Sequence, residues 1–151
     1  MTKFLAAALQ LGPASPTIGE TAERILKLID QAAAAGVRLA ALPELALTPY
    51  FAAEIHSDLN RYTSARDNAA AIAAISARAK QAKMALALPF AELAGNAVYN
   101  SMAILDEAGT QVGTFRKMHI PGQAEPKPDG AFTILEKRYF RPGDLGFGVF
   151  D

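Results

Sequence analysis

The sequence predicts an α/β fold in which helices pack on an open sheet. Short apolar runs of strand length alternate with segments whose apolar residues recur at helical spacing. The connections near the start of the chain are short, so a strand, a helix and a second strand form one βαβ unit. The two strands of such a unit are parallel.

The first βαβ unit occupies about the first forty residues. Phe4–Leu11 and Val37–Leu42 are predicted to be its buried strands. Between them, Thr17 and Glu20 have the spacing of a capping box, which predicts the start of a helix of about 16 residues. Gly36 is the expected C-cap of this helix.

A second helix and three more strands follow. After a polar loop to about Arg66, the alanine-rich segment Asn68–Ala82 predicts a helix, because alanine has the highest helix propensity. The last two of the three strands are joined by a glycine-closed turn and should form a hairpin. The predicted strands are Met84–Phe90, Tyr99–Leu105 and Gln111–Phe115.

The last third of the chain shows little periodicity. Residues 116–144 are predicted to be a loop, and a loop of this length in a compact domain is usually functional. Leu145–Phe150 is predicted to begin another strand.

Composition limits the classes of function. The 151 residues fit one domain, and a formal net charge of zero without a basic stripe argues against a nucleic-acid or membrane partner. No apolar run approaches the ~20 residues that span a bilayer, and the N-terminus is interpreted as a strand rather than a signal peptide. We therefore expect a cytoplasmic protein. The chain has no cysteine, and His56 and His119 are isolated, so no metal site is predicted.

Charged residues follow two predicted strands, where ligands gather in α/β sheets. Glu44 follows the second strand and Lys117 the fifth. In a site with little water, an ammonium can hold an oxyanion, and a neighbouring carboxylate stays ionised and can accept a proton. Glu136 could orient this pair and balance its charge. The alternatives are a solvated lysine, a helix-start or loop carboxylate at Glu44, and a surface ion pair of Glu136 with Lys137 or Arg138.

Other polar and aromatic residues are weaker candidates. His119 is interpreted as a hydrogen-bonded loop residue. Tyr50 and Phe51 could line an apolar pocket, although packing is the usual role of aromatic residues. Asn100 and Ser101 are interpreted as ordinary strand residues. No nucleophile-elbow serine motif, Walker A motif or dinucleotide-binding glycine motif occurs.

Two blocks of sequence resemble the nitrilase, or carbon–nitrogen hydrolase, superfamily. ALPELALTPYF around Glu44 is similar to its first catalytic block, and GTFRKMHIPG around Lys117 is similar to its second. FLAAALQLGP near the N-terminus and the hairpin YNSMAILDEAGTQVGTFRK also fit, so the resemblance covers essentially the whole chain. The closing stretch LEKRYFRPGDLGFGVFD and the loop before it most resemble the N-carbamoyl-amino-acid amidohydrolases, particularly the D-specific branch.

This resemblance implies a four-layer α-β-β-α sandwich, homo-oligomers that associate through outer helices, and a Glu-Lys-Cys triad without metal or organic cofactor. Glu44 would be the general base, Lys117 would stabilise the tetrahedral intermediate, and Glu136 would support the triad. His119 would stand near the pocket. The family's cysteine lies one strand beyond Asp151, so we expect residues 1–151 to be the N-terminal portion of a single domain, truncated before the nucleophile.

The resemblance also implies an activity, which is hydrolysis of a non-peptide C–N bond in a small amide or ureido substrate, such as an N-carbamoyl amino acid. The chain alone should be inactive because it lacks cysteine, and it should expose apolar surface and be poorly soluble. Two alternatives stay open. One is a non-catalytic fold or assembly module, and the other is a fragment of a nitrilase or a β-ureidopropionase-like enzyme.

Overall fold

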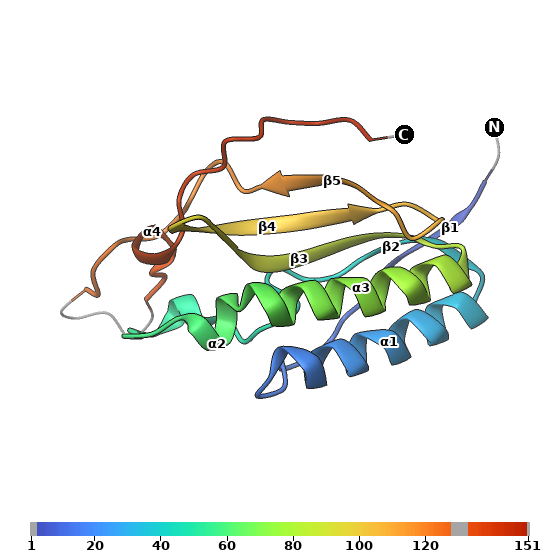
Figure 1. Ribbon diagram of the computed structural model, residues 1–151, viewed down its shortest axis with the longest axis horizontal. Coiled ribbons are helices and arrows are strands. Elements are labelled where there is room, and N and C mark those ends of the chain that lie inside the picture. Colours follow the sequence, from blue (N-terminus) through green and yellow to red (C-terminus); the bar gives the residue numbers. More distant parts are fainter. Residues whose placement is uncertain (1–2, 128–132, 151) are drawn as a thin grey trace.

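The computed structural model describes residues 3–127 and 133–150, which form one five-stranded sheet with two long helices on one face (Figure 1). The strands lie in chain order. The first three are parallel and the last two are antiparallel additions, which confirms the predicted α/β fold and the predicted hairpin. The strands are β1 (Leu5–Ala8), β2 (Val37–Ala41), β3 (Ala85–Ala94), β4 (Ala97–Leu105) and β5 (Gln111–Arg116).

Both long helices begin at side-chain caps. At the first, the Thr17 hydroxyl accepts from the Glu20 N–H at 3.2 Å and the Glu20 carboxylate accepts from the Thr17 N–H at 3.3 Å, which confirms the predicted capping box. The second begins three residues earlier than predicted, because Ser64 caps it by accepting from the Asp67 N–H at 3.2 Å. The two helices are α1 (Ile18–Ala34) and α3 (Ala65–Ala82).

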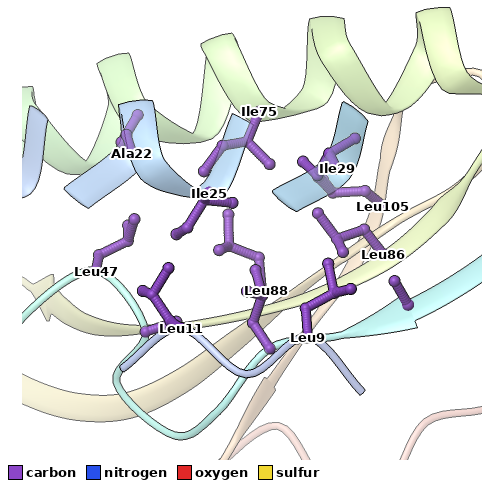
Figure 2. Packing of buried hydrophobic residues seen from close by; sticks show 14 of the residues in the cluster. Leu9, Leu11, Ala22, Ile25, Ile29, Leu47, Ile75, Leu86, Leu88 and Leu105 are labelled. Atoms are coloured by element: carbon purple, nitrogen blue, oxygen red, sulfur yellow. The ribbon is translucent and has the colours of Figure 1, made fainter. Parts of the chain in front are cut away.

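The main core lies between these helices and the sheet (Figure 2). Ile25 and Ile29 from α1 and Ile75 from α3 are fully buried against the sheet. Leu86 and Leu88 on β3 point toward them, as expected for alternate residues of a strand. Burial of each such side chain contributes about 1.5–3 kcal/mol, so this packing fixes the strands from whose ends the site is built.

Neither of the long helices, α1 and α3, covers the other face of the sheet. Leu39 on β2 is 42% exposed there, whereas its neighbour Ala40 points into the core and is 1% exposed. The described residues thus supply one helical layer and one sheet, two of the four layers that the sequence resemblance implies. The exposed apolar side chains agree with the expected apolar surface, and poor solubility stays a prediction. No helix in the described ranges is long and apolar enough to cross a membrane.

Three short helical segments were not predicted. Two lie in the polar loop after β2, and the third is a single turn in the predicted loop 116–144, of which residues 128–132 lie outside the described residues. They are η1 (Phe51–Ala53), α2 (Asn60–Thr63) and α4 (Glu136–Tyr139).

The predicted strand over Leu145–Phe150 is wrong, because this segment forms no strand. It runs past β5 without joining the sheet (Figure 1). The Phe147 ring packs on Phe115 with 5.9 Å between ring centroids, and Phe150 occupies space that a side chain at Gly113 would fill. The segment is therefore attached by aromatic packing rather than by a ladder of main-chain hydrogen bonds.

An ion-pair network fixes the end of β5. The Arg116 guanidinium donates two hydrogen bonds to Glu92 on β3, at 2.8 and 2.6 Å, and one to Asp144 at 2.8 Å. The Ser101 hydroxyl donates to the same Glu92 carboxylate at 2.6 Å. Hydrogen bonds from Arg116 lower the pKa of Glu92, and this effect together with the Ser101 hydrogen bond outweighs the opposing effect of burial.

We expect Glu92→Gln to lower the free energy of unfolding by about 1.5–3 kcal/mol at neutral pH, because it weakens hydrogen bonds to a partly buried charge. Folding lowers the pKa of Glu92, so the carboxylate's contribution is present above its unfolded pKa near 4.5 and is lost as pH falls through the folded pKa. Urea denaturation from about pH 3 to about pH 7 should show the two proteins converging at the acid end.

The matched control is Glu107→Gln, which breaks only the exposed ion pair between Arg38 and Glu107 at 3.6 Å. This change should alter stability by less than about 0.5 kcal/mol at every pH. A stability difference for Glu92→Gln that stayed constant down to about pH 3 would contradict the network's role.

Candidate active site

Three charged side chains from distant parts of the chain meet at one edge of the sheet. Glu44 follows β2, Lys117 follows β5, and Glu136 begins α4. The Lys117 ammonium donates to Glu44 Oε1 at 2.6 Å and to Glu136 Oε2 at 2.8 Å. The structure therefore brings the three predicted catalytic residues into direct contact, with the lysine between the two carboxylates.

The main chain around Glu44 is held against β3 on both sides. The Leu42 N–H donates to the Ala87 carbonyl at 3.1 Å, and the Ala46 N–H donates to the Pro89 carbonyl at 3.0 Å. Between them Leu45 adopts a positive φ of 50°, a conformation that costs a non-glycine residue about 1–3 kcal/mol. Burial of the Leu45 side chain in a second apolar cluster offsets this strain. The turn that presents Glu44 is thus fixed by the sheet and by packing.

The main chain of Lys117 is held from two directions. Its N–H donates to the Asn100 carbonyl at 2.8 Å, and its carbonyl accepts from the Gly143 N–H at 2.9 Å. A Cβ atom at position 143 would collide with the main chain of Arg116, so only glycine allows this approach. The main chain that carries the Lys117 side chain is therefore fixed in position.

Glu136 is buried, and both of its carboxylate oxygens are occupied. The residue is 2% exposed. Oε1 accepts from the Tyr50 hydroxyl at 2.8 Å and Oε2 accepts from Lys117. Arg138 pairs instead with Glu125 at 2.7 Å, so the alternative of a surface ion pair between Glu136 and Arg138 is wrong.

Glu44 differs from Glu136 in exposure and in how its oxygens are used. Its side chain is 46% exposed. Oε1 accepts from Lys117 and also from the side-chain amide of Asn100 at 2.7 Å. Oε2 accepts no hydrogen bond from another described residue. One oxygen of Glu44 is thus held while the other is open for proton exchange.

Sequence reasoning missed the contact of Asn100. The residue sits inside β4 and is 6% exposed, and no local pattern indicates which side chain it meets. A polar residue in an apolar strand was the only signal that could have singled it out.

The two carboxylates keep Lys117 charged. Burial by itself lowers the pKa of Lys117, but hydrogen bonds to Glu136 and Glu44 and the negative charges of both carboxylates outweigh burial and raise it. Burial and the hydrogen bond to Glu136 likewise raise the pKa of Tyr50, which stays a neutral donor. The protonated lysine cannot serve as a base, but it places a fixed positive charge where an oxyanion could form.

Two hollows in the surface meet at Glu44. One, of about 240 Å³, also has Lys117 in its wall and is otherwise mostly apolar, with Met102 and Phe115 among its lining residues. The other, of about 380 Å³, includes Tyr50. Both charged residues of the Lys117–Glu44 contact therefore line the first hollow.

The remaining predicted binding residues lie apart from this contact. Phe51 is 2% exposed and stacks on Tyr62 with 4.7 Å between ring centroids, so its role is packing and it lines neither hollow. His119 is exposed and makes no side-chain hydrogen bond to another described residue. Within the described ranges, no group of three or more histidine, aspartate or glutamate side chains could hold a metal ion.

Comparison with known proteins points to one family. The family model described as carbon–nitrogen hydrolase matches residues 5–151. The chain is 36% identical over 124 residues to an N-carbamoylputrescine amidase from Arabidopsis thaliana, covering 82% of this chain and 39% of that protein. It is 35% identical over 133 residues to a citrullinase from Francisella tularensis subsp. tularensis, covering 86% of this chain and 44% of that protein.

Solved structures give the same result. The fold matches a carbon–nitrogen hydrolase from Helicobacter pylori G27 with a TM-score of 0.79 and 29% sequence identity, covering 95% of this chain and 46% of that one. The chain thus spans less than half the length of each of these relatives.

We expect Tyr50→Phe to lower the free energy of unfolding by about 1.5–3 kcal/mol, because it removes a hydrogen bond to the buried carboxylate of Glu136. Tyr62→Phe is the matched control. Tyr62 belongs to the same aromatic cluster, and its hydroxyl forms no hydrogen bond to another described residue. Its removal should lower the free energy of unfolding by less than about 0.5 kcal/mol. Equal losses for the two variants, measured by urea denaturation, would contradict the importance of the Tyr50–Glu136 contact.

Proposed function

The chain belongs to the carbon–nitrogen hydrolase family, and we propose that the complete protein carrying these residues hydrolyses a non-peptide C–N bond of a small ureido compound, such as an N-carbamoyl amino acid. One observation carries the proposal, namely a protonated Lys117 held between Glu44 and Glu136 while one oxygen of Glu44 stays open. The substrate class has separate support, since one similar protein is named for a carbamoylated amine and another for citrulline, both ureido compounds.

The reaction needs a nucleophile that these 151 residues do not contain, because the sequence has no cysteine. We propose that a cysteine in a following part of the same domain supplies it. The present chain would then be the N-terminal portion of a single carbon–nitrogen hydrolase domain.

In the first half of the reaction Glu44 Oε2 accepts the thiol proton, and the thiolate attacks the ureido carbon to form a C–S bond. The carbonyl oxygen becomes an oxyanion, which the Lys117 ammonium and a main-chain N–H stabilise. When the tetrahedral intermediate collapses, the terminal C–N bond breaks. Glu44 returns its proton to the departing nitrogen, and ammonia leaves.

In the second half water replaces the thiolate. Glu44 takes a proton from water, the resulting hydroxide attacks the thiocarbamate carbon, and the C–S bond breaks with the proton returning to sulfur. The released N-carboxyamine decays to carbon dioxide and the free amine. Glu136 takes no part in proton transfer in this scheme, because both of its oxygens hold Lys117 and Tyr50 rather than the substrate.

The cellular context completes the proposal. We infer a cytoplasmic homo-oligomer whose subunits meet through the outer surfaces of α1 and α3. This assembly leaves the edge of the sheet that carries Glu44 and Lys117 accessible to small molecules.

A second candidate, a non-catalytic assembly module with this fold, is favoured by the absence of cysteine from the sequence. The two candidates differ in what the coding sequence contains after Asp151. A cysteine-bearing continuation supports the hydrolase. A natural end at Asp151, with defined oligomers and no turnover, supports the module.

The hydrolase proposal predicts release of ammonia from N-carbamoyl amino acids by the complete protein, faster than from β-ureido acids, simple amides or nitriles. Glu44→Gln should lower kcat by about 10²–10⁴-fold because it removes the general base. Lys117→Met should lower kcat by about 10²–10³-fold because it removes an oxyanion donor.

The matched controls are Glu107→Gln and Lys83→Met, which change exposed residues outside α1 and α3 and should leave kcat unaltered. Full activity in Glu44→Gln, or no ammonia from any of the four substrate classes, would refute the hydrolase.

A further inference from the structure

Asn100 connects one strand to both of the central charged groups. Its side-chain Nδ2 donates to Glu44 Oε1 at 2.7 Å, and its main-chain carbonyl accepts from the Lys117 N–H at 2.8 Å. It pairs with Ala91 in the β3–β4 ladder, which fixes its position along the sheet. Ala103 and Leu105 on the same strand point to the helices, so alternation places the Asn100 side chain on the opposite face, with the site.

The two donors to Glu44 Oε1, the Lys117 ammonium and the Asn100 amide, differ in their other interactions. The Lys117 ammonium is shared with Glu136 and must also reach the oxyanion. The Asn100 amide makes no hydrogen bond to any other side chain among the described residues. It is also neutral, so a developing negative charge on the substrate attracts it far less than it attracts the ammonium. Asn100 is therefore the donor that can stay with Glu44 throughout a turnover.

Glu44 needs such a donor because little else restrains its carboxylate. Its side chain is 46% exposed, whereas the Glu136 side chain is 3% exposed and bonded through both oxygens. When the ammonium turns toward an oxyanion, its bond to Glu44 weakens. A half-exposed carboxylate without a second anchor would then rotate, and a displacement of about 1 Å can cost 10²-fold in rate.

We propose that Asn100 is a positioning residue that holds Glu44 Oε1 while Lys117 engages the oxyanion, so that Oε2 remains aimed at the proton it transfers. This inference rests on the proposed function. Asn100 also lines the hollow that holds Glu44 and Lys117, but its amide is committed to Glu44 Oε1, so in this scheme it acts through Glu44. Its effect therefore belongs to the chemical step rather than to substrate binding.

The test compares two variants of Asn100 in the complete protein. Asn100→Ala deletes the donor, and we expect kcat to fall by about 10–10²-fold while KM changes by less than about twofold. Asn100→Asp keeps the shape of the side chain but sets a carboxylate against Glu44 Oε1, and it should lower kcat further. Because Asn100→Asp is isosteric, it serves as the test if the alanine variant does not fold.

Asn68→Ala is the matched control for the loss of a buried carboxamide. The Asn68 amide is 4% exposed and donates to the Ala91 carbonyl at 2.8 Å, without contacting Glu44 or Lys117. It should lower the melting temperature about as much as Asn100→Ala and leave kcat within about twofold. Equal kcat in Asn100→Ala and Asn68→Ala, or a loss confined to KM, would overturn the positioning role.

Crystal structures of the unsubstituted protein and Asn100→Ala give a readout that does not depend on turnover. In the variant, Lys117 Nζ is the one described donor left to Glu44 Oε1, so the Glu44 carboxylate should take more than one orientation about that contact. A carboxylate fixed in a single orientation would overturn the inference, whatever the activity. If the unsubstituted protein releases no ammonia, the proposed function fails on that result, and the crystallographic comparison still decides the role of Asn100.

Discussion

The contact of one lysine ammonium with two carboxylates is the constraint on which the arrangement of this chain depends. Glu136 is almost fully buried, and an ionised carboxylate is tolerated there only with close partners. Lys117 supplies the compensating charge, and the lysine is in turn held by Glu44. Glu44 follows β2, Lys117 follows β5 and Glu136 begins α4. The parallel and antiparallel parts of the sheet must therefore both form before the three side chains can meet.

The two glutamates have opposite roles because their surroundings differ, although both bond the same ammonium. Glu136 has a donor on each oxygen and almost no access to water, which suits a residue that holds its neighbours in place. Glu44 has two donors on one oxygen and is half exposed, so its other oxygen can exchange a proton with a ligand or with water. The hydrogen bonds of the two carboxylates thus distinguish their roles, whereas the spacing of Glu44 and Glu136 in the sequence does not.

What the sequence could predict was local. The capping box at Thr17, the alanine-rich helix and the apolar strands were predictable because neighbouring residues determine them. Residues 145–150 look like a strand, but a strand also needs an edge to pair with, and this segment packs through aromatic rings instead. Glu44 and Lys117 could be predicted as site residues because each follows a strand, and ligands of α/β sheets bind beyond the carboxyl ends of the strands. The partner of Asn100 depends on which face of β4 meets which loop, and only the tertiary fold decides that.

The adjacent cations Arg116 and Lys117 at the end of β5 point to opposite faces of the sheet, so one can stabilise the fold while the other serves the site. Arg116 points to one face, where its planar guanidinium makes several fixed bonds to Glu92 and Asp144. Lys117 lies on the other side, and its ammonium can redirect its three N–H donors by rotating about its last C–N bond. A guanidinium in the lysine's place would keep its bidentate carboxylate partner and could not turn to a new oxyanion without breaking both bonds. Arg116, with its rigid guanidinium, therefore anchors the strand. Lys117, with its compact and rotatable ammonium, lies in the site, where its donors must change partners.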